Sequence, residues 1–128
     1  LERYVVASAI NGMLAQRLVR RVCLKCCELA PVDDSSKGLF DAHGIDVSRF
    51  PRPRGCDQCN QTGYKGRIGI FELISADDQL KDLVKSEQTS RVQLAEFLHR
   101  KGHQGLRFQG LKRVSEGVTT IDEVLRVT

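Results

Sequence analysis

The feature that most constrains this chain of 128 residues is a set of four cysteines arranged as two C-x-x-C pairs. Cys23 and Cys26 form the first pair and Cys56 and Cys59 the second, with 29 residues between Cys26 and Cys56. A C-x-x-C turn points two thiolates at one tetrahedral ion, and two such turns complete a four-coordinate sphere. We therefore predict a structural Zn²⁺ site with these four cysteines as its ligands, leaving no position for water or substrate.

Other uses of the thiols are less well supported. Disulfides are disfavoured because the cysteine count, five, is odd and no export signal is recognisable. A thioredoxin-like redox protein needs one C-x-x-C at a helix start rather than two matched pairs. Four thiolates can also hold an iron–sulfur cluster, so that alternative stays open. We expect Cys27 to be a free thiol, and His43 is a minor alternative ligand.

The spacer between the pairs exceeds the roughly 15–20 residues of a compact zinc ribbon, so we expect it to loop out. Residues 27–54 contain few large apolar side chains, and such a segment buries too little surface to fold by itself. Structural zinc supplies roughly 10–16 kcal/mol of apparent binding energy in small zinc modules. We predict that chelation unfolds this insertion while the C-terminal helices persist.

The positive charge is concentrated beside the cysteines. Residues 1–70 hold eleven Lys and Arg against seven Asp and Glu, whereas the rest of the chain is balanced. One interpretation is that cations near the pairs offset the net charge of −2 on zinc with four thiolates; these are Arg20, Arg21, Lys25, Arg54 and Lys65. The other is a surface that contacts a partner protein or acidic lipid, made of Arg49, Arg52, Arg54 and Lys65.

Periodicity and turn residues predict a mixed, helix-rich α/β fold. We expect a helix over residues 2–15, a strand over 16–23, and a short helix over 39–43 that Gly44 stops. The run Ile68–Ile74 predicts a strand, and because it is apolar on both faces we expect both to be covered. No run of about 18 apolar residues occurs, so no transmembrane segment is predicted.

The last third of the chain has a helical pattern. Ser75 is the expected cap of a helix that carries Leu80. Ser90 with Gln93 forms a capping-box pattern for the next helix, and Thr120 with Glu123 forms a second one for the last. A helix between these two should end at Gly117.

Three stretches in the same order resemble the C-terminal part of the type II secretion and type IV pilus assembly ATPases, the GspE/PilB group. They are LAQRLVRRVCLKC at Leu14–Cys26, GCDQCNQTGYKGRIGIFELI at Gly55–Ile74, and SEGVTTIDEVLRVT at Ser115–Thr128. The second is the most specific, because a C-x-x-C pair leads directly into a glycine-rich strand. Leu24 and Cys27 depart from residues common in the family, and neither change removes a ligand.

The resemblance implies the C-terminal part of a RecA-like P-loop ATPase domain with an inserted tetracysteine zinc subdomain and a terminal helical bundle. Residues 1–22 would close the ATPase core, 23–62 form the zinc subdomain, and 63–128 supply a strand and helices. It also implies a hexamer that powers type II secretion or pilus assembly at the cytoplasmic face of the bacterial inner membrane. Other subunits, inner-membrane platform proteins and acidic lipid are the implied partners.

The chain itself lacks the G-x-x-x-x-G-K-[ST] loop that cradles phosphates. We therefore expect ATP and Mg²⁺ to bind only in a full-length parent, and the isolated chain to show no ATPase activity. A rival class is a basic zinc module that binds nucleic acid, but such modules use aromatic side chains for base stacking, and only Phe50 and Tyr64 lie near the pairs. A stand-alone redox protein is a third class, which thiol labelling would reveal.

Overall fold

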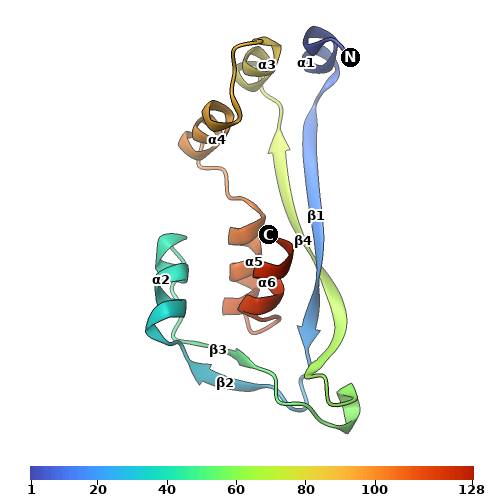
Figure 1. Cartoon of the computed structure of the whole chain (residues 1–128), viewed down its shortest axis with the longest axis vertical. Helices are drawn as coiled ribbons and strands as arrows, with labels where there is room; N and C mark the ends of the chain where they lie inside the picture. The colour runs from blue at the N-terminus through green and yellow to red at the C-terminus, as the bar shows by residue number, and fades with distance from the viewer. The chain divides into compact units, whose positions relative to one another are not determined.

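The computed structural model describes residues 1–128 as a mixed α/β chain with six α-helices (Figure 1). The strands form two two-stranded sheets, β1 with β4 and β2 with β3. No helix has both the length and the apolar character that crossing a membrane requires. The elements are α1 (Arg3–Ala9), β1 (Gly12–Val22), β2 (Glu28–Pro31), α2 (Asp34–Ala42), β3 (Arg49–Arg52), the 3₁₀ helix η1 (Asp57–Cys59), β4 (Tyr64–Ser75), α3 (Asp78–Lys85), α4 (Arg91–Arg100), α5 (Leu106–Ser115) and α6 (Ile121–Val127).

The contacts divide the chain into two compact units. The first unit contains residues 1–15 and 72–104, and the second unit contains residues 16–71 and 105–128. In the first unit α1 packs against α3. The second unit holds all five cysteines and a hydrophobic core of five buried residues.

The first helix is shorter than its periodicity predicts. The pattern favours a helix over 2–15, but α1 ends at Ala9 and β1 begins at Gly12. Gly12 lies so close to β4 that an added Cβ would stand 3.2 Å from the carbonyl oxygen of Ile74, and Ala76 donates to the carbonyl of Asn11 at 3.0 Å. Pairing with β4 therefore overrides the helical spacing of residues 12–15, because tertiary context outweighs local propensity.

Of two helix caps predicted in the C-terminal third, one is wrong and one is confirmed. Asp77, rather than the expected Ser75, caps α3, and its carboxylate accepts from Leu80 N at 2.8 Å. Ser75 instead ends β4. The capping box of Ser90 and Gln93 on α4 is confirmed, with both reciprocal hydrogen bonds present.

The core of the second unit joins the insertion to the C-terminal helices. Phe40 of α2 and Ile45 form one buried cluster with Leu111 and Val114 of α5 and Val124 of α6. Gly110 sits at the crossing of α5 and α6, where an added Cβ would lie 2.5 Å from Val124. The insertion thus gains its core from residues far away in the sequence.

The insertion is more ordered than its composition predicts. Its helix begins at Asp34, not Leu39, because Asp33 caps it by accepting from Ser36 N at 2.7 Å. The left-handed Gly44 (φ +66°) follows its end, as expected. Flanking it, β2 and β3 pair antiparallel from Glu28↔Arg52 to Pro31↔Arg49. The sequence predicts neither strand, because each is four residues long and contains a proline, which is confined to sheet edges.

The strand predicted over Ile68–Ile74 is confirmed as part of β4, but its expected cover on both faces is wrong. Ile70 is 2% exposed and lies near Gly110 of α5, whereas Phe71 and Leu73 are 49% and 65% exposed. The apolar side chains of β4 therefore have packing partners in this chain only on the face that carries Ile70.

The free edge of β1 is paired with the segment that opens α6. Val22 N donates to Val118 O at 3.0 Å, and Thr119 Oγ1 donates to Arg20 O at 2.7 Å. Thr120 caps α6 by accepting from Glu123 N at 3.3 Å, as predicted. The other half of the predicted capping box, a bond from the Thr120 backbone N–H to the Glu123 carboxylate, is wrong, because that carboxylate accepts from Arg20 of β1 instead.

Candidate metal centre

Two tight turns carry the four cysteines. Cys23 directly follows β1, and Cys26 N and Cys27 N donate back to its carbonyl at 3.3 and 2.9 Å. Cys56 precedes η1 and Cys59 ends it. Gly63 then reverses the chain with φ +79°, and its N–H points at Cys59. Each C-x-x-C pair is therefore closed by backbone hydrogen bonds that direct both sulfurs to one side.

The four sulfurs converge on one point. All lie within 4.8 Å of one another. The Cys23–Cys56 Sγ distance is 3.9 Å, and the Cys26–Cys59 and Cys56–Cys59 distances are 3.8 Å. Four thiolates at the usual zinc–sulfur distance of about 2.3 Å on tetrahedral corners stand about 3.8 Å apart. The sulfur set therefore has the size of a tetrahedral thiolate site, and none of the five cysteines is in a disulfide.

Backbone N–H groups surround the sulfurs. Gly55 N donates to Cys26 Sγ at 3.2 Å, Cys56 N to Cys59 Sγ at 3.3 Å, and Gly63 N to Cys59 Sγ at 3.2 Å. Such donors favour the ionised thiolate, which is the form that binds metal. The arrangement therefore offsets part of the negative charge that four thiolates gather.

The pKa values of the Cys56 and Cys59 thiols are shifted in opposite directions. Burial raises the pKa of Cys59, but the N–H groups of Cys56 and Gly63 and the neighbouring thiols outweigh burial and lower this pKa to about 6. Burial is the main cause that raises the pKa of Cys56 to about 11. Without an ion the pair thus favours one thiolate beside one thiol, and a cation would draw off the remaining proton.

The fifth cysteine and His43 lie outside the cluster. Cys27 directs its sulfur to the carbonyl of Glu28 at 3.7 Å, and burial followed by the neighbouring Cys26 raises the pKa of its thiol. His43 Nδ1 is 2.9 Å from the carbonyl oxygen of Leu39 in α2. The donor set that the fold assembles is therefore four sulfurs with no imidazole.

The basic residues proposed for partner contact are partly engaged within the fold. Arg49 donates to the carbonyl of Leu29 at 2.8 Å, and Arg54 pairs with Glu28 at 2.7 Å. The Arg52 guanidinium lies 5.7 Å from the centre of the Phe50 ring. Two of the cations expected to offset the thiolates thus form ion pairs elsewhere: Arg54 with Glu28, and Arg20 with Glu123.

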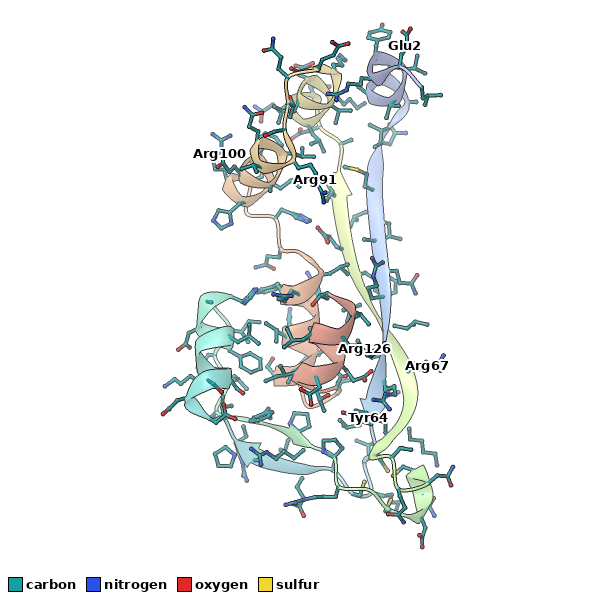
Figure 2. The ribbon with its side chains drawn as sticks, viewed as in Figure 1. Glu2, Tyr64, Arg67, Arg91, Arg100 and Arg126 are labelled. Carbon is teal, nitrogen blue, oxygen red and sulfur yellow. The ribbon has the colours of Figure 1, made fainter.

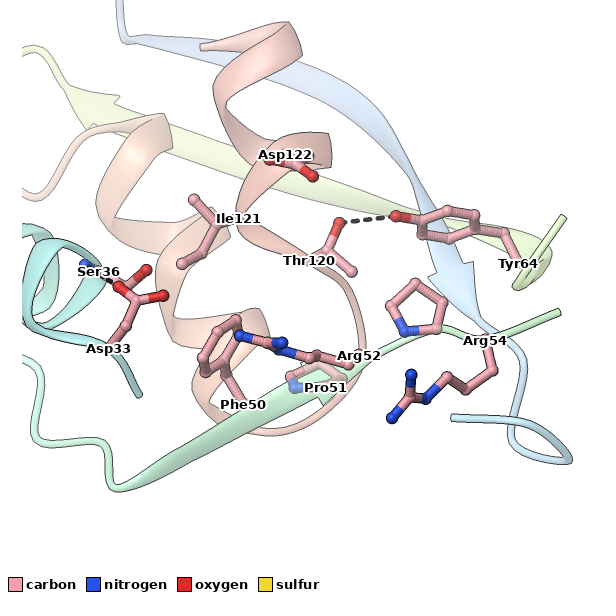
Figure 3. A pocket seen from close by; sticks show the side chains of 11 residues that line it. Asp33, Ser36, Phe50, Pro51, Arg52, Arg54, Tyr64, Thr120, Ile121 and Asp122 are labelled. Atoms are coloured by element: carbon pink, nitrogen blue, oxygen red, sulfur yellow. Dashed lines mark hydrogen bonds between the residues drawn. The ribbon is translucent and has the colours of Figure 1, made fainter. Parts of the chain in front are cut away.

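Arg52 and Arg54 line a cavity of about 420 Å³ in the second unit, and Figure 3 shows both side chains there. Tyr64 lies across it, with its hydroxyl 3.0 Å from Thr120 Oγ1. Asp33 and Asp122 also line this cavity, so its walls carry charges of both signs. Lys65, on β4, is exposed and lies outside it.

Sequence reasoning missed the role of Glu123. Its side chain is 2% exposed and its carboxylate accepts hydrogen bonds from Arg20 N, Arg20 Nε, Arg20 Nη2, Arg126 Nε and Arg126 Nη2. Burial opposes ionisation, but the two guanidinium groups outweigh it and lower the pKa of Glu123 to about 2. In the sequence Glu123 looks like half of a capping box, and only the docking of α6 on β1 reveals its partners.

Comparisons with known proteins identify the class of this chain. Residues 1–126 match the family model described as "Type II/IV secretion system protein", and the chain belongs to that family, a region of the type II secretion and type IV pilus assembly ATPases.

Several relatives are similar over almost the whole chain. It is 43% identical over 129 residues to the type IV pilus assembly ATPase TfpB of Acinetobacter baylyi, covering 99% of this chain and 22% of that protein. It is 39% identical over 128 residues to the type II secretion system ATPase E of Vibrio cholerae, covering 100% and 25%. Identity to the type IV pilus assembly ATPase PilB of Thermus thermophilus is 38% over 131 residues, covering 100% and 14%. The chain thus spans a quarter or less of the length of these relatives.

Proposed function

We propose that this chain is the C-terminal zinc-binding part of a hexameric ATPase that energises type II protein secretion or type IV pilus assembly. Family membership and the spacing of the four sulfurs support the proposal. In the parent protein, residues 1–22 would end the RecA-like ATPase core, 23–62 would form the zinc subdomain, and 63–128 would add a strand and the terminal helices.

The observation that carries the metal assignment is the mutual approach of Cys23, Cys26, Cys56 and Cys59 within 4.8 Å. The four residues would hold Zn²⁺ as thiolates, and the ion would supply a fixed link between the end of β1 and the start of β4. A complete sulfur shell leaves no open position, so the role is structural.

Cobalt substitution tests this assignment. Co²⁺ in a tetrahedral thiolate site absorbs strongly in the visible range, and this absorption is absent from six-coordinate cobalt. We expect one Co²⁺ per chain with a thiolate charge-transfer band, displaced stoichiometrically by Zn²⁺. Cys26→Ser should weaken the band and the affinity, whereas the matched control Cys27→Ser should change neither. A substoichiometric metal content, or loss of the spectrum in C27S alone, would contradict the assignment.

The chain is proposed to act in the parent by structure and contact rather than by turnover. It contains no phosphate-cradling loop, so ATP and Mg²⁺ would bind elsewhere in the parent. We expect no magnesium-dependent phosphate release from the purified chain. Release above a matched blank that survives further purification would refute this expectation.

We further propose that the second unit contacts an inner-membrane platform protein or a neighbouring ATPase subunit at the cytoplasmic face of the bacterial inner membrane. Arg52 and Lys65 are the better candidates for the contact, because Arg49 and Arg54 already have hydrogen-bond or ion-pair partners within the fold. Secretion or piliation by a parent that carries R52E and K65E should fall, while the control R100E on α4 should leave it unchanged. Unaltered secretion in R52E/K65E would favour charge compensation instead.

Nucleic-acid binding is the weaker alternative. Tyr64 and Phe50, the aromatic residues near the cysteines, are both partly buried, and the Tyr64 ring is covered by Arg20 at 4.2 Å. One face of the Tyr64 ring is therefore taken by Arg20, and Phe50 packs partly against the core of the second unit, which does not favour base stacking on these rings.

A further inference from the structure

Three arginines from three separate elements line one cavity of the second unit. Arg20 of β1, Arg67 of β4 and Arg126 of α6 border a space of about 470 Å³, and Leu18 and Val19 complete its lining. No acidic residue lines this cavity. Figure 2 shows Arg67 and Arg126 on the same part of the second unit, where β4 and α6 approach β1. We call Arg20, Arg67 and Arg126 the three-arginine site.

One carboxylate lies behind the site and is already saturated. Glu123 Oε1 and Oε2 accept from Arg20 at 2.8 to 3.0 Å and from Arg126 at 2.9 to 3.4 Å. An ionised carboxylate offers about four lone-pair positions, so five donors leave it no capacity for Arg67. The side chain of Arg67 makes no ion pair or hydrogen bond within the fold, and the residue is exposed. The four charged groups together therefore carry a net charge of +2.

Arg20 and Arg126 keep unused donors on side chains that the fold already orders. A guanidinium has five N–H donors. Arg20 and Arg126 each donate one N–H of Nε and one of Nη2 to Glu123, which leaves three N–H donors on each of them and all five of Arg67. The Arg20 guanidinium is also held over the Tyr64 ring. Side chains fixed in this way lose little further entropy when an anion binds, and both remain about half exposed.

We propose that the three-arginine site binds the phosphate group of a phosphate-bearing molecule. A phosphate monoester carries roughly 1.5 to 2 negative charges at neutral pH, which matches the net +2 of the site. Its oxygens also accept the parallel N–H pairs that guanidinium groups present. A single carboxylate would neutralise only half of this charge. The inference extends beyond the proposed function and does not depend on the identity of the metal.

Pyrophosphate, titrated at constant ionic strength into the metal-loaded chain, is the probe. The arginine Nε–Hε signals report binding residue by residue in ¹H–¹⁵N spectra. We expect saturable shifts of the signals of Arg20, Arg67 and Arg126. Arg67→Gln should weaken binding at least about tenfold, which corresponds to about 1.4 kcal/mol. Arg67→Lys should fall between, because it keeps the charge but loses the planar fork.

The matched control is Arg100→Gln, an exposed arginine of α4 without an ion pair, which should leave the affinity unchanged. Because Arg67 has no partner in the fold, R67Q should keep the thermal midpoint of the wild-type chain. Shifts that never saturate, an affinity unchanged in R67Q, or acetate binding as tightly as pyrophosphate would overturn the proposal.

A second arm identifies the source of the phosphate. Vesicles of phosphatidylcholine with phosphatidylglycerol are sedimented with the wild-type chain, R67Q and R100Q. Sedimentation that R67Q alone reduces assigns the phosphate to a lipid headgroup. A saturable pyrophosphate response without vesicle binding assigns it to a soluble molecule.

Discussion

Removing the charge of Glu123 should destabilise the second unit more than the loss of any surface ion pair in the chain. Glu123→Gln keeps the shape of the side chain but replaces one acceptor oxygen with a donor that faces two guanidinium groups. The pKa of Glu123 lies near 2 against an ordinary value of 4.5. Each pKa unit corresponds to about 1.4 kcal/mol, so the shift sets an upper bound of roughly 3 kcal/mol. Because Arg20 and Arg126 are about half exposed, solvent screening reduces the expected loss to about 2 kcal/mol.

Urea and thermal unfolding of the metal-loaded chain at neutral pH measure this loss. For a unit of this size, 2 kcal/mol lowers the midpoint by about 8–16 °C. The control is Glu116→Gln, whose surface pair with Arg113 at 2.9 Å should be worth less than about 1 kcal/mol. A loss in E123Q no larger than in E116Q would refute the reasoning.

The pH dependence has a definite sign. The folded-state pKa of Glu123 is depressed, so its contribution is complete above pH 4.5 and is lost as the pH falls toward 2. The stability difference between wild type and E123Q should therefore shrink over this window. The measured quantity is the difference between the two unfolding free energies, because protonation of the thiolates and loss of metal affect both proteins equally. A gap that stays constant down to the lowest pH would contradict an ionised Glu123.

Three further predictions concern the metal and the packing. Chelation should expose the amides of α2, α5 and α6 to hydrogen exchange together, because Phe40 and Leu111 share one core. The amides of α3 and α4, in the first unit, should keep their protection. Exchange confined to the insertion would argue against this. Gly110→Ala should cost about 1–3 kcal/mol in urea unfolding, because its Cβ would stand 2.5 Å from Val124, and a neutral result would mean that α6 shifts freely. Gly38→Ala is its matched opposite: with nothing within 4 Å in the middle of α2, it should stabilise the chain by about 0.5–1 kcal/mol.

The sequence anticipates the cysteine cluster because the information is local. Two residues between cysteines define a turn, and two such turns need only meet. Capping residues act over a similar distance, which is why Ser90 and Gly117 indicate helix ends that the structure contains. The expected effect of chelation is different now that the structure is known: α5 and α6 should open with the insertion instead of persisting, and the reason is not local. That α5 and α6 share a core with the insertion depends on contacts between segments about 70 residues apart.

The errors occur where distant pairing decides the local conformation. Residues 12–15 have a helical pattern but become a strand because β4 lies beside them. The strands β2 and β3 carry prolines; they pair with each other, and β3 also packs against α5. Glu123 has two possible uses in the sequence, and the position of Arg20 selects one. In each case the deciding partner lies tens of residues away, beyond the reach of periodicity or capping rules.

The sulfur cluster and the Glu123 network act on the same strand, β1. Cys23 follows β1 directly, and Arg20, three residues earlier, is tied to α6 through Glu123. Between them, Val22 and Arg20 use the free edge of β1 to bond Val118 and Thr119. An exposed strand edge is a site for unwanted pairing, and here the segment before α6 covers it. The end of β1 is therefore held by the sulfur cluster, by hydrogen bonds along its edge and by the ion pairs of the buried Glu123 carboxylate, so a disturbance of the sulfur cluster should reach the three-arginine site through β1.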